Sequence, residues 1–172
     1  MLVDYHFGSR EGLIVEAMRE HLENFIIETE FVLAALDRKK SMEENIEIMV
    51  DGLWKIFSGD LFYISLENIV ESRTNPAVLE GLIPLVRKFH DSLNALWNKA
   101  FFDYDASPEQ IRLLMNMTLG LLRGLGVQTI QKPDAEYFQS ILSGWKALLM
   151  RELKIIRTPA ADADQLKSTK NI

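Results

Sequence analysis

Helix start signals recur along the whole of this sequence, and they constrain its fold more than any other feature. Ser41 followed by Glu44 has the form of a capping box. The Ser-Pro-Glu-Gln segment at 107–110 combines a cap, a proline at the first helical position and a capping-box partner. Neither an alternating strand pattern nor an Asn-Gly hairpin signal accompanies them. The sequence therefore predicts an all-α fold, a multi-helix bundle.

The start and stop signals divide the chain into six helical segments. Pro84 lies inside the fourth, where we expect either a kink or a fresh helix. Residues 157–172 offer little to bury, and we expect a disordered tail there. The expected helices cover about residues 9–36, 41–57, 60–73, 76–104, 108–130 and 134–156.

The helix expected at 108–130 is apolar on two sides. One stripe comprises Ile111, Leu114, Thr118, Leu122, Leu125 and Thr129, and a second, roughly 150° away, comprises Leu113, Met117, Gly120, Gly124 and Val127. A surface helix needs only one apolar stripe, so the second indicates a second partner. Gly120, Gly124 and Gly126 each cost the helix about 1 kcal/mol relative to alanine, and close helix approach would offset that cost.

The last helix is also broadly apolar. Two such helices from each of two chains would form a symmetric four-helix interface. A helix buried at the centre of a single subunit remains the alternative. For a homodimer, the expected interface residues are Leu113, Met117, Gly120, Gly124, Val127, Ile141, Trp145, Leu148 and Leu149.

The composition excludes several classes of function. The formal net charge of −6 comes without a basic stripe, so the chain as given should bind DNA poorly. The absence of cysteine excludes disulfides, thiolate metal sites and cysteine nucleophiles. The longest apolar stretch is too short to span a bilayer, and the N-terminus has no signal core. We expect a cytoplasmic protein with no membrane partner.

Catalytic motifs are missing from the sequence. It holds three histidines, none placed with a glutamate at the spacing of di-iron helical bundles. There is no His-Glu-x-x-His motif, phosphate-binding loop or nucleophile elbow. We therefore expect no enzyme, no metal site and no cofactor.

Two segments carry a resemblance to a known family. Residues 2–13, LVDYHFGSREGL, resemble the junction in TetR/AcrR-type transcriptional regulators where the DNA-recognition helix ends and the effector domain begins. Residues 67–76, ENIVESRTNP, are similar to a segment common in the C-terminal domains of that family. The helix order agrees as well, so the likeness extends to about residue 156.

The resemblance implies a division of the chain. Residues 1–8 would be the remnant of the recognition helix and turn, and 9–156 the ligand-binding and dimerisation domain. In a full-length form, Tyr5, His6 and Arg10 would contact the DNA backbone. The helix-turn-helix that reads DNA would precede this sequence, so we expect operator binding only where those helices are present. Met1 is then either an internal methionine of a longer protein or a true start.

The resemblance also implies a repressor that responds to a small hydrophobic effector bound among its central helices. A helical dimeric scaffold without ligand or DNA binding is the alternative, and it needs no cavity. Each of the pocket residues is also an ordinary core residue by type. The expected pocket residues are Trp54, Phe62, Ile69, Phe89, His90, Leu93, Trp97, Met115, Thr118 and Leu122.

Overall fold

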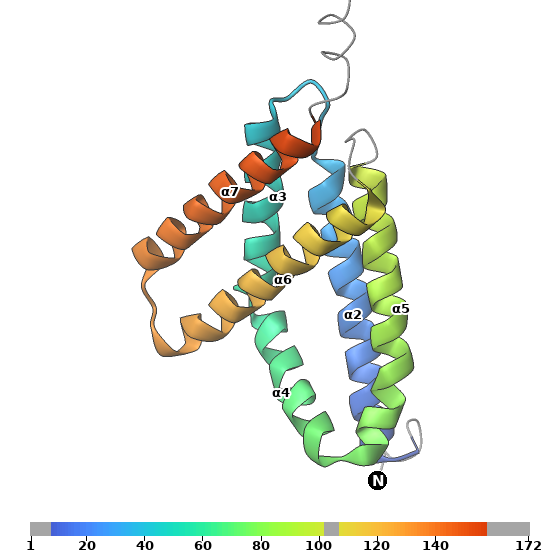
Figure 1. Ribbon diagram of the computed structural model, residues 1–172. Helices are drawn as coiled ribbons and strands as arrows, with labels where there is room; N and C mark the ends of the chain where they lie inside the picture. The colour runs from blue at the N-terminus through green and yellow to red at the C-terminus, as the bar shows by residue number, and fades with distance from the viewer. Residues whose placement is uncertain (1–7, 102–106, 158–172) are drawn as a thin grey trace, which may run out of the picture.

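A computed structural model describes residues 8–101 and 107–157, and six helices account for nearly all of them (Figure 1). They are α2 (Arg10–Ala34), α3 (Met42–Phe57), α4 (Asp60–Thr74), α5 (Pro76–Ala100), α6 (Pro108–Gln131) and α7 (Ala135–Arg157). No strand occurs in the described part of the chain. The predicted all-α fold is confirmed, with helix ends within a few residues of those expected.

The capping signals seen in the sequence form real caps. The Ser41 hydroxyl accepts a hydrogen bond from the Glu44 N–H at 3.1 Å, and the Glu44 carboxylate accepts one from the Ser41 N–H at 2.7 Å. Ser107 and Gln110 form the same reciprocal pair at the start of α6. Both caps satisfy backbone donors that the first helical turn leaves without partners.

Removing one of these caps should weaken the fold measurably. We expect Ser41→Ala to lower the free energy of unfolding by about 1 kcal/mol, because the Glu44 N–H loses its acceptor. Urea unfolding followed by circular dichroism measures this change. The matched control is Ser143→Ala on α7, where an exposed serine without a capping role is replaced; an equal loss in both variants would rule the cap out as the cause.

The fourth helix differs from one of the expectations. Pro84 lies inside a single helix, α5, which continues to Ala100, so the fresh helix considered after Pro84 is wrong. Pro84 and Glu80, whose carbonyl loses its usual donor, are both exposed, and water can satisfy that carbonyl. The helix ends before the expected residue 104, and residues 102–106 lie outside the described part.

All six helices contribute to one main core, and Met18, Val78 and Leu82 form a small second cluster between α2 and α5. Helices α2 and α5 run parallel along their lengths, and α3 packs beside α2 (Figure 1). Three phenylalanines tie these elements together, with Phe25 edge-on to both Phe57 and Phe89 at centroid distances of 5.3 Å. Helices α6 and α7 both pack on α3 and lie in front of it in Figure 1. Their sides away from α3 therefore share one face of the molecule.

Candidate functional site

The outer face of α6 and α7 is apolar and uncovered. Its exposed side chains include Leu113 (60%), Met117 (49%) and Val127 (39%) on α6, and Leu148 (43%) on α7. The core stripe on the other side of α6 is buried or half-buried, from Ile111 to Thr129. The structure thus confirms that the two apolar stripes of this helix lie on different sides. We name the uncovered surface, made of Leu113, Met117, Gly120, Gly124, Val127, Tyr137, Ile141, Gly144 and Leu148, the α6/α7 face.

Three glycines leave the backbone of this face open. A Cβ added at Gly120, Gly124 or Gly144 would meet nothing within 4 Å. Gly126 is different, because an added Cβ there would run into the Phe57 carbonyl oxygen and the Phe62 ring. The sequence pattern does not distinguish Gly120, Gly124 and Gly126 of α6 from one another. Of these three, only Gly126 is needed for packing inside the subunit. The others allow another helix to approach the α6 backbone closely.

One residue expected at the dimer interface lies in the subunit core, and another is only partly exposed. Leu149 is buried in the subunit core with 1% of its surface exposed, so its assignment to the interface is wrong. Trp145 is half-buried, and its indole N–H donates to the Thr118 hydroxyl of α6 at 3.1 Å. Both lie beside Leu148 on a helix that is apolar over a wide arc, and the sequence pattern alone does not separate its two sides.

The residues expected to form the ligand pocket are mostly packed core. Phe62, Phe89, Leu93, Trp97, Met115, Thr118 and Leu122 are all buried, and Trp54 is half-buried against the Phe138 ring at a centroid distance of 5.7 Å. The Thr118 hydroxyl is engaged, since it donates to the Leu114 carbonyl and accepts from Trp145. These side chains come together as expected, but they fill the core rather than line an open cavity.

Two of the expected pocket residues are exposed instead. Ile69 is 47% exposed, which contradicts its predicted inward position. Helix α6 crosses α4 near Phe62 and Tyr63, and Ile69 lies two turns further along, beyond that crossing. His90 is exposed, with its ring edge-on to Phe89. Helical periodicity gives the direction of a side chain, but not whether another element extends far enough to cover it.

Two buried polar atoms in this core have no protein hydrogen-bond partner. They are the Thr29 hydroxyl on α2 and the Trp97 indole nitrogen on α5, on residues 0% and 1% exposed. An unpaired buried donor or acceptor costs roughly 1–3 kcal/mol. Because α2 and α5 pack together, these unsatisfied groups belong to the same pair of helices.

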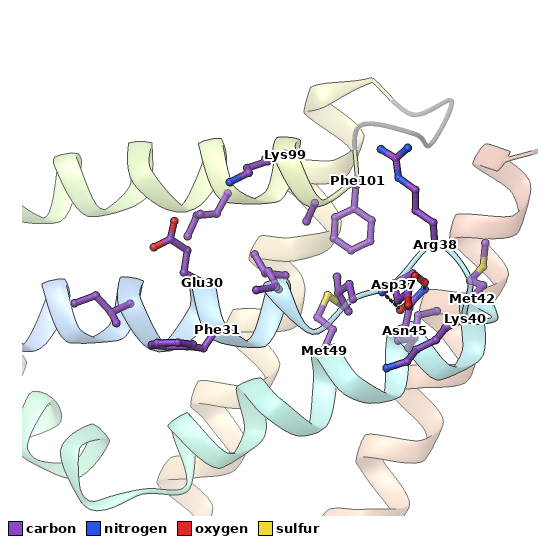
Figure 2. A pocket seen from close by; sticks show the side chains of 17 residues that line it. Glu30, Phe31, Asp37, Arg38, Lys40, Met42, Asn45, Met49, Lys99 and Phe101 are labelled. Atoms are coloured by element: carbon purple, nitrogen blue, oxygen red, sulfur yellow. Dashed lines mark hydrogen bonds between the residues drawn. The ribbon is translucent and has the colours of Figure 1, made fainter.

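An open groove lies at the far end of the bundle, where α2, α3 and α5 meet (Figure 2). Its volume is about 770 Å³, within the range of small-molecule sites. None of the expected pocket residues lines it. We name this site the α2/α3/α5 groove; its lining residues are Ile27, Glu30, Phe31, Leu33, Ala34, Leu36, Asp37, Arg38, Lys40, Met42, Asn45, Ile46, Met49, Leu96, Lys99, Ala100 and Phe101.

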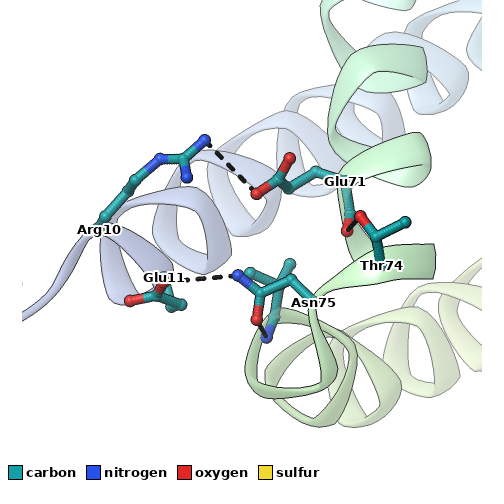
Figure 3. A network of polar contacts seen from close by, with 6 residues as sticks. Arg10, Glu11, Glu71, Thr74 and Asn75 are labelled. Carbon is teal, nitrogen blue, oxygen red and sulfur yellow. Dashed lines mark hydrogen bonds and ion pairs between the residues drawn. The ribbon is translucent and has the colours of Figure 1, made fainter.

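The N-terminal end of α2 is tied to the corner between α4 and α5 (Figure 3). The Arg10 guanidinium lies 3.4 Å from the Glu71 carboxylate, and the Asn75 amide donates to Glu11 at 3.4 Å. Hydrogen bonds from the backbone N–H of Glu11 and from Asn75 hold the pKa of Glu11 below its usual value. Gly8, at φ 71°, makes the turn into this helix.

Of the three predicted DNA-contact residues, only Arg10 lies in the described part of the chain. Arg10 is described and pairs with Glu71, and its side chain remains 73% exposed. Its contact with DNA stays a prediction, and so do those of Tyr5 and His6, which lie outside the described residues. The expected tail at 157–172 falls outside them as well, apart from Arg157, which ends α7.

His21 should make the stability of the fold depend on pH. It lines a small hollow with Phe25, Ile56 and Phe62, and this burial lowers its pKa below the ordinary 6.5. The folded state then favours neutral imidazole, so stability is full above pH 6.5 and falls as the pH drops toward the lowered pKa. We expect wild-type protein to lose stability between pH 7.5 and about 5.5.

Urea unfolding at the two pH values measures this loss. We expect His21→Gln to reduce the pH dependence, and His90→Gln, which replaces an exposed histidine, is the matched control for the substitution itself. An unchanged pH dependence in His21→Gln would assign the loss to other groups.

The described ranges contain neither a metal-binding cluster nor a membrane-spanning helix. Among residues 8–101 and 107–157, no group of three or more histidine, aspartate or glutamate side chains is arranged to hold a metal ion. In the same ranges, every helix is too short or too polar to cross a membrane.

Comparison with known proteins gives one informative match. The chain is 25% identical over 137 residues to the HTH-type transcriptional regulator CymR of Pseudomonas putida. The match covers 80% of this chain but 66% of the relative, a little less than two thirds of its length. No protein-family model and no solved structure matches the chain significantly. By its sequence, the chain is thus similar to a transcription regulator of the helix-turn-helix type.

Proposed function

We propose that this chain is the dimerisation and effector-responsive body of a TetR-type transcriptional repressor. The observation that carries the proposal is the α6/α7 face, an apolar surface left uncovered by the rest of the subunit. The similarity to a helix-turn-helix regulator gives the class of function that such a dimer would serve.

A second copy of the chain is the occupant that suits this face. The exposed residues Leu113, Met117, Gly120, Gly124 and Val127 recur at intervals of three and four, which places them along one seam of α6. Tyr137, Ile141, Gly144 and Leu148 repeat the spacing on α7. Two copies of such a helix pair are complementary across a two-fold axis, apolar against apolar and open backbone against side chain.

Effector response requires the ligand to bind one arrangement of the helices better than another. A change of about 100-fold in operator affinity would need about 2.7 kcal/mol of coupling. Helix α2 suits this role because its N-terminus is tied to the α4–α5 corner and its C-terminal part carries the unpaired Thr29 hydroxyl. A polar ligand group that reached the Thr29 hydroxyl or the Trp97 indole nitrogen would satisfy a buried atom that has no partner in the subunit.

Chromatin immunoprecipitation of the tagged natural protein, expressed from its own locus, tests the proposal. We expect occupancy at one or a few genomic sites. Met117→Glu, which places a charge on the α6/α7 face, should abolish the occupancy, and Val70→Glu on exposed α4 should preserve it. Wild-type signal no higher than that of an untagged strain would overturn the proposal.

A dimeric scaffold is the second candidate, and one observation favours it. The predicted pocket residues are packed as closely as an ordinary core, with Met115 and Leu122 at 0% exposure. A scaffold needs no cavity there. A stable dimer that occupies no genomic site would support this candidate over the regulator.

A further inference from the structure

The α2/α3/α5 groove has a buried apolar floor. Met42, Ile46 and Met49 of α3 and Phe101 at the end of α5 are 9% exposed or less. The exposed Ile27 and Phe31 of α2 also line it, and Phe31 is seen on α2 in Figure 2. Apolar walls with a few polar groups at the edge are typical of small-molecule sites.

Hydrogen bonds fix the α2–α3 turn that lines part of the groove. The Asp37 N–H donates to the Asn45 side-chain oxygen at 3.0 Å, and the Asn45 amide donates to the Asp37 carbonyl at 2.9 Å. One Asp37 carboxylate oxygen accepts from the Lys39 N–H at 2.9 Å. The turn between α2 and α3 is thus fixed before any ligand arrives, which lowers the entropy cost of binding.

The charge at the groove differs from that of the whole molecule. Its described lining residues include the cationic Lys40 and Lys99 as well as the anionic Glu30 and Asp37, on a chain whose net charge is −6. Lys40 and Lys99 lie on opposite sides of the groove, on the turn after α2 and on α5 (Figure 2). Lys40 interacts electrostatically with Glu44, but neither ammonium forms a close ion pair with a carboxylate of the described residues. The groove therefore favours a ligand with an anionic group.

The shape of the groove favours a chain over a compact ring system. The lining residues of α2 run from Ile27 to Ala34, a distance of about 10 Å along the helix axis. Two of the floor residues are methionines, whose flexible side chains adapt to an alkyl chain. We propose that the groove binds a medium-chain fatty carboxylate, with its alkyl chain along Phe31 and Met49 and its carboxylate met by Lys40 and Lys99.

Isothermal titration of the full chain with decanoate tests this proposal. We expect binding with a 1:1 stoichiometry per chain that weakens as the salt concentration rises. Decanol, which lacks the charge, should bind more weakly. Phe31→Ser removes an exposed wall residue and should weaken binding by about tenfold, equivalent to roughly 1.4 kcal/mol of lost apolar contact. The double variant Lys40→Gln/Lys99→Gln should weaken decanoate by about fivefold and leave decanol unchanged.

Lys55→Gln provides the control, since Lys55 is an exposed lysine outside the groove. Absence of decanoate binding would overturn the proposal, as would binding that neither groove variant weakens. Binding at this site requires neither a dimer nor DNA. Light scattering on the same samples therefore separates failure of this proposal from failure of the proposed function.

Discussion

Gly126→Ala is expected to destabilise the subunit strongly. Gly126 is buried where α6 crosses the turn between α3 and α4, and an added Cβ would collide with the Phe57 carbonyl oxygen. That atom belongs to the backbone, so relief requires α6 to move away from α3. Such overpacking costs about 1–3 kcal/mol or more, which exceeds the gain of about 1 kcal/mol in helix propensity.

Thermal and urea unfolding measure this effect. For a chain of this length, each kcal/mol corresponds to a fall of about 2–4 °C in Tm. Asn116→Ala is the matched control, because it places the same alanine at an exposed position of the same helix. It should change stability by less than about 0.5 kcal/mol. Equal stability in the two variants would show that α6 does not approach Phe57 as closely as described.

A charge on the α6/α7 face is expected to separate the subunits. Leu113 and Met117 are 60% and 49% exposed in the single chain, so glutamate at either position costs the subunit fold little. In a dimer, the same carboxylate would be buried without a partner, which costs several kcal/mol. A loss of about 3 kcal/mol weakens association by more than about 100-fold.

Sedimentation velocity over a range of protein concentrations measures this loss of association. The control is Ile64→Glu, at a residue of α4 that is 53% exposed and lies off the α6/α7 face. Circular dichroism should show the same helix content in all three proteins. If Ile64→Glu and Met117→Glu dissociate the protein equally, the contact surface is not specific to α6 and α7.

Local signals in the sequence were sufficient to predict the helices. The caps at Ser41 and Ser107 are decided within one turn of helix, and both formed as expected. The division of α6 into two stripes follows from 100° per residue and needs no tertiary information. The roles of individual residues depend on tertiary contacts. Gly126 is needed for packing and Gly124 is not, because Phe57 lies against Gly126.

The candidate sites were harder to predict for the same reason. The α2/α3/α5 groove joins the end of α2 and the start of α3, which are adjacent in the sequence, to the end of α5, which α4 separates from them. Its location depends on α2 and α5 running parallel, a relation that no local pattern expresses. Ile69 has the periodicity of an inward residue, but no neighbouring helix covers it.

The mass of the wild-type chain in solution tests the central claim most directly. Size-exclusion chromatography with light scattering, over micromolar concentrations, should give twice the 19.7 kDa of one chain. We expect that result because formation of the dimer buries the apolar α6/α7 face away from water. A mass of 19.7 kDa at every concentration would contradict the account, since Met117 and Leu113 would then face solvent in the native protein.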